Sequence, residues 1–203
     1  MKIWQRITSQ FGKPSGFLGS LAGFIMTYRT SNRERNTWAV DLLNLHLADN
    51  VLEIGFGPGL ALTMMSKLVS TGIIYGIDHS EKMVLLAQKR NQHAIASGRM
   101  KIFLGPVSEL PELSHTIDKV LDVNSFQFWN DPLESLQVIK KSMNKGGTIA
   151  IVHQPRKPGS NESHTIDAGN RIASFLTDAG FERVRIHKKK MKPVAAICVI
   201  GNV

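Results

Sequence analysis

One stretch of the chain, residues 51–59 with the sequence VLEIGFGPG, constrains the fold more than any other. Its first four residues are apolar apart from Glu53, as expected of a short buried strand. Three glycines at alternate positions follow, and residues 60–65 continue as the start of a helix. Glycines let a ligand approach the backbone, and a helix start presents unpaired N–H groups. The stretch therefore predicts a strand–turn–helix unit with a nucleotide-type site.

The spacing of the glycines separates two kinds of nucleotide site. A dinucleotide site uses Gly-x-Gly-x-x-Gly. Here the third glycine, Gly59, comes one residue early, and Leu60 occupies the position that this pattern reserves for glycine. Glu53 lies in the end of the strand, where a carboxylate would repel a pyrophosphate and attract an ammonium or sulfonium centre. The turn therefore favours a cationic ligand over a dinucleotide.

A second strand that ends in an acid supplies the next part of the pattern. Residues 72–78, GIIYGID, end in Asp78, nineteen residues after Gly59, and a carboxylate there can accept both ribose hydroxyls of an adenosine. The turn and the acid together resemble motif I and the following acid of the class I methyltransferases that use S-adenosylmethionine, whose usual motif is Glu/Asp-x-Gly-x-Gly-x-Gly. A tight structural turn in another α/β fold is the alternative interpretation of the glycines.

The resemblance implies that S-adenosylmethionine is the cofactor, and it implies which residues bind it. They come from the glycine turn, the acid with the helix after it, and the loops after the third and fourth strands: Glu53, Gly55, Phe56, Gly57, Gly59, Asp78, His79, Met83, Gly105, Pro106, Val107 and Asn124. The family usually has Gly-Asp-Ala in the third of these loops, where the Asp reaches the adenine amino group. Pro106 replaces that acid here, which leaves adenine recognition to backbone groups, apolar contact or Ser108.

Strand and helix patterns alternate along the rest of the chain. Further strands are predicted at residues 100–104, 117–124, 148–152, 182–187 and 194–200, with helices between them up to the last pair. Ser31–Glu34 reads as a capping box that starts a helix with Trp38, Leu42 and Leu45 on its apolar stripe. This order predicts a doubly wound α/β sheet. The resemblance covers residues 31–200 and implies a Rossmann-like sheet of seven strands with the last antiparallel.

One domain with an N-terminal extension is expected. Residues 1–30 are apolar but interrupted by glycines, and they predict an N-terminal helical extension that either packs on the core or forms a mobile cap. Residues 31–203 then form the methyltransferase domain implied by the resemblance.

The sheet rule places the chemistry. In an open α/β sheet the ligand lies beyond the carboxyl ends of the strands, which brings the glycine turn and Asp78 together with residues 105–107, 124–129 and 153–156. Two short sequences, NSFQFW after strand four and HQPR after strand five, resemble those of bacterial small-molecule methyltransferases of unassigned substrate. Methyl transfer from a sulfonium mainly requires positioning and desolvation, and a general base is needed only if the acceptor is protonated.

Each candidate side chain has a functional and a structural interpretation. Asn124, a candidate catalytic residue, either lines the crevice near the methionine part of the cofactor or caps the following turn. His153, the second candidate, is a base, an acceptor ligand or a hydrogen-bonded structural residue. Three aromatic residues either wall an acceptor pocket or belong in part to the core: Phe126, Phe128 and Trp129. Arg156 is an anion anchor for an acidic acceptor or a solvated loop charge.

Composition limits the other classes of function. The single cysteine, Cys198, excludes an internal disulfide and a cysteine metal cluster, and no metal-binding triad stands out. This composition suits a reducing cytoplasm. No stretch is apolar enough to cross a membrane, and the first residues do not fit a signal peptide.

A net charge of +9 raises the question of nucleic acid, because Arg183–Lys192 holds six basic residues and no acid. A solvated hairpin is the favoured interpretation of this run, and the Asp/Asn-Pro-Pro-Tyr signature of amino-methylating nucleic-acid enzymes is absent. The sequence thus predicts a methyltransferase acting on a small-molecule acceptor, with no nucleic acid expected. The alternatives are a nucleic-acid methyltransferase that uses the basic run, an NAD-dependent oxidoreductase, and a non-catalytic protein that binds the cofactor.

Overall fold

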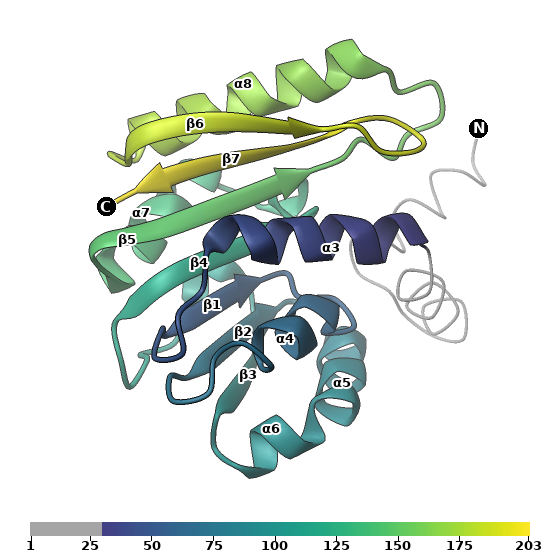
Figure 1. Cartoon of the computed structure of the whole chain (residues 1–203). Coiled ribbons are helices and arrows are strands. Elements are labelled where there is room, and N and C mark those ends of the chain that lie inside the picture. Colours follow the sequence, from purple (N-terminus) through teal and green to yellow (C-terminus); the bar gives the residue numbers. More distant parts are fainter. Residues whose placement is uncertain (1–29) are drawn as a thin grey trace.

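The computed structural model describes residues 30–203, which form one mixed sheet of seven strands between two layers of helices (Figure 1). The strands are β1 (Val51–Ile54), β2 (Ile74–Asp78), β3 (Met100–Leu104), β4 (Ile117–Val123), β5 (Met143–His153), β6 (Glu182–Lys189) and β7 (Ala196–Asn202). Their order in the sheet is β3-β2-β1-β4-β5-β7-β6, and only β7 runs antiparallel to its neighbours. The predicted doubly wound sheet with an antiparallel last strand is confirmed. The predicted extension over residues 1–30 lies, except for Thr30, outside the described residues.

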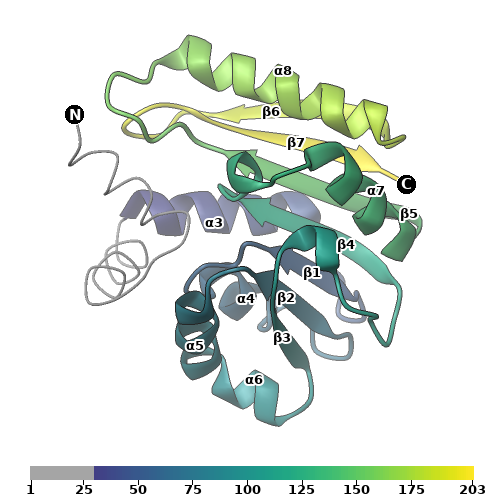
Figure 2. The ribbon, with the colours of Figure 1, turned by 180° about the vertical axis from the view of Figure 1, so that it is seen from behind.

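The helices divide between the two faces of the sheet, as the two opposite views show (Figure 2). One face carries α3 (Thr30–Leu43), α4 (Leu60–Met65), α5 (Glu81–Arg90) and α6 (Gln92–Ala96), whereas the other carries α7 (Pro132–Ser142) and α8 (Glu162–Asp178). Two short 3-10 turns, η1 (Val107–Glu109) and η2 (Phe126–Phe128), follow β3 and β4. Among residues 30–203, no helix has both the length and the apolar character that a bilayer span requires.

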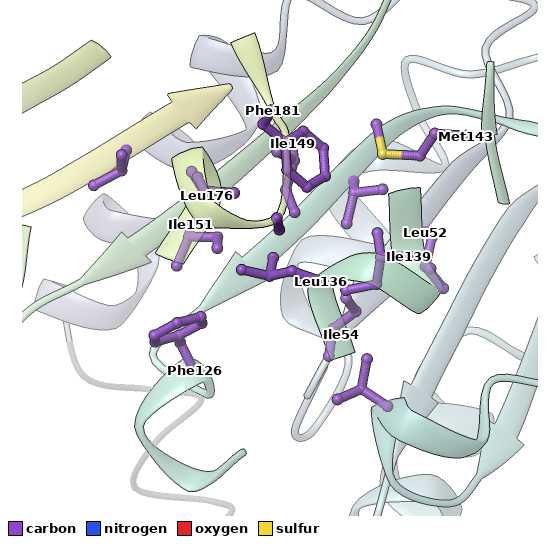
Figure 3. Close-up of a cluster of buried hydrophobic side chains, with 14 of the residues drawn as sticks. Leu52, Ile54, Phe126, Leu136, Ile139, Met143, Ile149, Ile151, Leu176 and Phe181 are labelled. Carbon is purple, nitrogen blue, oxygen red and sulfur yellow. The ribbon is translucent and has the colours of Figure 1, made fainter. Parts of the chain in front are cut away.

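The sheet buries apolar side chains on both of its faces. In β1, Leu52 and Ile54 join the cluster under α7 and α8, while Val51 joins the cluster under α3, α4 and α5. Figure 3 shows the first cluster, in which Leu136 and Ile139 of α7 reach the sheet. Successive side chains of a strand point to opposite faces, so a parallel strand covered on both sides is apolar throughout. This is why Glu53, buried inside such a strand, calls for a functional explanation.

Helix α7 begins at residues whose types are typical of a helix start. The side chain of Asp131 accepts a hydrogen bond from the Glu134 amide at 2.9 Å, and Pro132 occupies the first helical position. An N-cap acceptor and a proline without N–H both suit a helix start, where the first amides lack intrahelical partners. The capped start fixes where the preceding β4–η2 segment ends.

The predicted start of α3 is wrong, and its predicted apolar stripe is only part of the buried face. Ser31 is already helical, so it does not cap the helix, and α3 ends at Leu43 with Asn44 in a left-handed conformation (φ 47°). The fully buried side chains of α3 are Asn32, Arg35, Ala39, Val40 and Leu43, whereas Trp38, Leu42 and Leu45 are half-buried against the same cluster. The buried face begins with two polar residues because the first turns of α3 border a pocket rather than the sheet.

Two further boundaries differ from the prediction. Strand β5 starts at Met143, directly after α7, although Gly146 and Gly147 predicted a break before a strand at Thr148. Gly146 lies inside β5 with a φ of 81°, and the β4–β5 register shifts nearby. Strand β6 continues through Lys189, so most of the basic run is strand and not a connection. An edge strand tolerates lysines because one of its sides faces solvent.

Candidate active site

A pocket lies at the carboxyl ends of β1, β2 and β4, beside the first turns of α3. Its lining comes from α3, the glycine turn, the β2–α5 connection and the segment after β4. The lining residues are Asn32, Arg35, Asn36, Glu53, Gly55, Phe56, Gly57, Pro58, Leu60, Asp78, His79, Met83, Val123, Asn124, Ser125 and Phe128. The sheet rule thus located the pocket, although the sequence did not indicate its α3 wall.

The three glycines of the turn all have left-handed backbones, with φ values of 62° at Gly55, 54° at Gly57 and 76° at Gly59. Gly55 also lies against the segment after β4, since an added Cβ would be 2.2 Å from the Cβ of Ser125. At Gly59 an added Cβ would be 2.8 Å from the Cβ of Ala87 in α5. Gly59 therefore packs the turn onto α5 and does not line the pocket. Both close approaches require glycine for packing as well as for conformation.

Asp78 connects the turn to the start of α5. Its Oδ2 accepts a hydrogen bond from the Gly57 amide at 2.8 Å, and its Oδ1 accepts one from the Ser80 amide at 2.9 Å. The side chain is 6% exposed, and burial raises its pKa despite these two amides. A carboxylate offers about four lone-pair positions. Asp78 therefore keeps accepting capacity for a ligand while it holds the glycine turn in place.

Three carboxyl groups on neighbouring strands form the floor of this region: Glu53 in β1, Asp78 at the end of β2 and Asp122 in β4. Burial, and then the charges of Asp122 and Asp78, raise the pKa of Glu53 well above its usual range, against the hydrogen bond from the Leu62 amide of α4. The Oε2 of Glu53 is buried without a hydrogen-bond partner, although the residue borders the pocket. Three close acids and an unpaired carboxyl oxygen favour a cationic donor as the ligand.

Asp122 organises the loop after β4. It is fully buried and accepts hydrogen bonds from the Ser125 amide and hydroxyl and from the Phe126 amide. Burial nevertheless raises the pKa of Asp122 to about 7. The Ser125 hydroxyl also donates to the carbonyl of Ile54. Ser125 thus joins the ends of β1 and β4 at the point where Gly55 passes.

The raised pKa of Asp122 predicts a pH-dependent stability. Between about pH 4 and pH 7 the unfolded chain has lost this proton and the folded chain keeps it, so the free energy of unfolding falls as pH rises. An Asp122→Asn variant lacks this effect, and its stability relative to the wild type should rise by up to about 1.4 kcal/mol per pH unit in that window. Urea unfolding of both proteins at pH 5, 6, 7 and 8 measures the difference. A constant difference across the series would contradict the raised pKa.

Asn124 occupies the pocket wall, but its amide group is engaged elsewhere. Its Nδ2 donates to the Gln154 carbonyl at 2.9 Å, and its Oδ1 accepts from the Gln154 amide at 2.8 Å. The residue has a φ of 62°, which asparagine tolerates better than most residues. Asn124 therefore lines the pocket, as one of the two interpretations expected, and it also ties the end of β4 to the end of β5.

His153 ends β5 and does not line the pocket. Its Nδ1 lies 3.1 Å from the Oε1 of Gln127, and burial followed by the charge of Arg35 lowers its pKa to about 4. The imidazole is neutral at physiological pH and is a weak base for proton abstraction. Its position favours the structural interpretation over that of a general base.

The three aromatic residues after β4 have different surroundings. Phe126 is buried, with its ring centroid 4.9 Å from that of Trp129 and 5.8 Å from that of Phe175 in α8. Trp129 is half-buried and donates from its indole to Ser125 at 3.3 Å. Phe128 alone of the three lines the pocket, and it is 43% exposed. Phe128 is the aromatic residue that a ligand can contact.

The remaining predicted residues lie around the pocket or outside its lining. Gly105 donates its amide to the carbonyl of Asp78 at 3.0 Å, Pro106 follows it, and Val107 is buried in the cluster under α7 and α8. Arg156 reaches across to α3, where it donates to the Ser31 hydroxyl at 3.4 Å and to the Asn32 Oδ1 at 3.1 Å. Within residues 30–203, no three His, Cys, Asp or Glu side chains are grouped as metal ligands.

The sequence analysis missed the wall formed by α3. Asn32, Arg35 and Asn36 border the pocket, and Arg35 is 5% exposed. One signal was present: Arg35 precedes Ala39 by four residues and Leu43 by eight, so it lies on the same helix face as two buried residues. A polar residue on a buried helix face indicates a partner or a ligand.

The fold and the pocket together define a class I, Rossmann-like methyltransferase domain. The family model described as "Methyltransferase domain" matches residues 52–151. The uncharacterized methyltransferase YdaC of Bacillus subtilis (strain 168) is 32% identical over 182 residues, covering 90% of this chain and 97% of that protein. The ubiquinone/menaquinone biosynthesis C-methyltransferase UbiE of Geobacter sp. (strain M21) is 25% identical over 122 residues, covering 60% of this chain and 52% of that protein.

A solved structure has the same fold. The SAM-dependent methyltransferase from Aquifex aeolicus superposes with a TM-score of 0.73 at 19% identity, covering 90% of this chain and 97% of that one. The chain therefore belongs to the class I SAM-dependent methyltransferases. It is an enzyme that uses S-adenosylmethionine as its cofactor, and the NAD-dependent and non-catalytic alternatives are set aside.

Proposed function

We propose that this enzyme methylates a small-molecule acceptor that enters the pocket beside Phe128. The proposal rests on one observation: the glycine turn, Asp78 and the exposed ring of Phe128 line the same pocket. A ring face attracts a cationic sulfonium and also contacts an apolar acceptor.

The charges around the pocket favour one orientation of the cofactor. Asp78 takes the ribose hydroxyls, as an accepting carboxylate suits, and the backbone of the glycine turn runs along the methionine part. The carboxyl group of Glu53, whose Oε2 has no hydrogen-bond partner within residues 30–203, is the countercharge for the ammonium group. In this orientation the acidic floor compensates the positive charges of the ligand, which reduces the mutual repulsion of Glu53 and its neighbouring acids.

The reaction is an in-line displacement at the methyl carbon. The acceptor nucleophile forms the new bond to this carbon, the carbon–sulfur bond breaks, and its electron pair stays on sulfur as the neutral thioether of S-adenosylhomocysteine. The protein contributes position and exclusion of water. An acceptor atom that is unprotonated at neutral pH needs no base, in agreement with a His153 that is neutral and outside the pocket lining.

The position of the basic run supports a small acceptor. Strand β6 is the edge strand, four strands from β1, which corresponds to roughly 19 Å across the sheet. Lys188 pairs with Glu162 of α8, and Lys189 lies 3.8 Å from Glu34 of α3, both at the exposed surface. These lysines therefore have partners within the chain and stand away from the glycine turn.

One observation favours the alternative of a nucleic-acid substrate. Strand β6 is antiparallel to β7, as β5 is, so its carboxyl end with Lys188 and Lys189 lies at the same edge of the sheet as the pocket. A phosphate backbone would have to run along this edge to bring a base to the methyl group. Such binding would depend steeply on salt, because each neutralised phosphate releases counterions.

The triple variant Lys188→Gln, Lys189→Gln and Lys190→Gln tests the proposal. Affinity for S-adenosylmethionine and transfer of labelled methyl groups to a small-molecule extract should stay within about twofold of wild type, and the melting temperature should change little because both lost ion pairs are exposed. Calorimetry, a methyl-incorporation assay and thermal melting give these readouts.

The opposing experiment uses duplex DNA and structured RNA at about 50 and 200 mM salt. Methyl incorporation into either nucleic acid, with tight binding at the higher salt that the triple variant loses, would replace the small-molecule proposal. Methyl incorporation into the small-molecule extract alone, at the same level in the wild type and the triple variant, supports the small-molecule proposal.

A further inference from the structure

Arg35 is a buried guanidinium without a carboxylate partner. It is 5% exposed, and none of the ion pairs formed within residues 30–203 includes it. Its Nη1 donates to the Gln154 Oε1 at 2.7 Å and its Nη2 donates to the Asn32 Oδ1 at 2.5 Å, so both partners are neutral amides. Its Nε is buried without any hydrogen-bond partner, and the residue lines the pocket.

A neighbouring positive charge makes the burial of the Arg35 guanidinium more unfavourable. Arg156 donates to the same Asn32 Oδ1 at 3.1 Å, which brings a second positive charge to the site. Burial, and then the charge of Arg156, lower the pKa of Arg35 to about 9. The guanidinium is nevertheless charged at neutral pH. A buried charge without an opposite charge is strongly unfavourable unless a ligand supplies one.

Buried hydrogen bonds hold Gln154, the partner of Arg35, in place. Gln154 is fully buried, and its Nε2 donates to the carbonyls of Lys192 at 3.2 Å and Val194 at 2.7 Å. The Gln154 backbone in turn holds Asn124 through two hydrogen bonds. Arg35 is therefore fixed in place by groups from α3 and from the connections after β5 and β6, with its Nε–H left unused.

We propose that Arg35 is an anion-binding residue of the pocket and that its ligand is a carboxylate group. This inference rests on the proposed function of the pocket as the methyl-transfer site. Two sources can supply the group: the methionine part of the cofactor, or an acidic acceptor bound next to it. A carboxylate in the pocket neutralises Arg35, and a guanidinium suits it in charge and in planar geometry. Together with Glu53, it gives the pocket one acidic and one basic group, which complement an amino acid.

The first experiment compares S-adenosylhomocysteine with its decarboxylated analogue, which differs only in the missing carboxylate. Calorimetry is done on the wild type, on Arg35→Met, and on Arg33→Met as a control at an exposed position of the same helix. If the cofactor is the source, Arg35→Met weakens S-adenosylhomocysteine about tenfold or more and leaves the analogue within about twofold. Arg33→Met changes neither ligand. Binding of S-adenosylhomocysteine by the wild type keeps the cofactor site itself separate from this question.

The second experiment covers the acidic acceptor. With S-adenosylhomocysteine saturating, inorganic phosphate and acetate are titrated while the Nε–H resonance of Arg35 is followed in an ¹⁵N-labelled protein. A saturable shift, accompanied by a calorimetric binding signal that Arg35→Met abolishes, assigns the site to a second ligand. The proposal is overturned if Arg35→Met weakens both adenosyl ligands equally, or weakens neither while phosphate and acetate give no Arg35-dependent binding.

Asn32→Asp separates anion binding from a structural role. The change places a carboxylate on the oxygen that already accepts from Arg35 and Arg156, so the chain supplies its own countercharge. The melting temperature should rise, and the affinity for the carboxylated ligand should fall about tenfold, with no change for the decarboxylated analogue if the cofactor is the source. If an acidic acceptor is the source, the acetate signal falls instead. A more stable protein with every affinity unchanged would show that Arg35 serves the fold only.

Discussion

Gly55→Ala should lower stability by roughly 2–5 kcal/mol and abolish measurable cofactor binding. The new Cβ would be 2.2 Å from the Cβ and 2.3 Å from the Oγ of Ser125, well inside van der Waals contact. Ser125 cannot move away freely, because its hydroxyl is bound to Asp122 and to the Ile54 carbonyl. The left-handed backbone (φ 62°) adds about 1–2 kcal/mol of strain.

Gly98→Ala is the matched control for this prediction. Gly98 also has a left-handed backbone, with a φ of 75°, but an added Cβ would meet no atom within 4 Å. Gly98→Ala should lower stability only by the conformational strain of about 1–2 kcal/mol, and its cofactor affinity should stay at the wild-type value. Thermal melting and calorimetry on both variants separate the steric contact from the strain.

A double variant tests the named contact. Ser125→Gly removes the Cβ and Oγ that clash with alanine at position 55, so Gly55→Ala should cost less in that background than in the wild type. The difference is the coupling energy of a double-mutant cycle. A cost of Gly55→Ala that is the same in both backgrounds, or no larger than that of Gly98→Ala, would contradict a clash with Ser125.

The parts of the site that could be predicted are close together in the sequence. Glu53, the glycine turn and Asp78 lie within 26 residues, and each is tied to a strand end that apolar patterns reveal. The sheet rule then places these strand ends together without further information. The regular alternation of strand and helix patterns predicted a doubly wound α/β sheet, and the family resemblance implied its seven strands.

The hydrogen bonds of the α3 wall could not be predicted because they join distant residues. Arg35 donates to Gln154, which is 119 positions away, and Asn124 pairs with Gln154 across 30 positions. Side-chain hydrogen bonds of this kind have no periodic signal. The predicted stripe of α3 used only apolar residues, so Asn32 and Arg35 were excluded although both are buried.

The aromatic residues show a similar limit at short range. Phe126 and Phe128 are two positions apart, and their spacing fits a strand or a packed segment equally well. The 3-10 turn η2 directs Phe126 into the core against Trp129 and Phe175, while Phe128 faces the pocket. Which ring is buried depends on α8, whose position relative to this turn is set by the sheet order and not by the local sequence.

Asp78→Ala should weaken S-adenosylmethionine by about tenfold or more, since each charge-assisted hydrogen bond to a ribose hydroxyl contributes roughly 1.5–3 kcal/mol. The variant also loses the acceptors of the Gly57 and Ser80 amides, so part of the loss comes from a loosened turn. A change in the turn affects every adenosyl ligand in the same way, whereas a lost ribose contact affects only ligands that carry the hydroxyl. The comparison of two ligands therefore separates the two effects.

The measurement is calorimetry with S-adenosylmethionine and its 2′-deoxyribose analogue on the wild type, Asp78→Ala and Asp78→Asn. The alanine variant should weaken the deoxy analogue several-fold less than the natural cofactor. Asp78→Asn should fall between wild type and alanine for the natural cofactor, because its amide keeps one oxygen acceptor but turns an N–H donor toward the Gly57 or Ser80 amide. Thermal melting confirms that each variant is folded before affinities are compared. Equal losses for both ligands would show that Asp78 acts only by holding the glycine turn and that the ribose is recognised elsewhere.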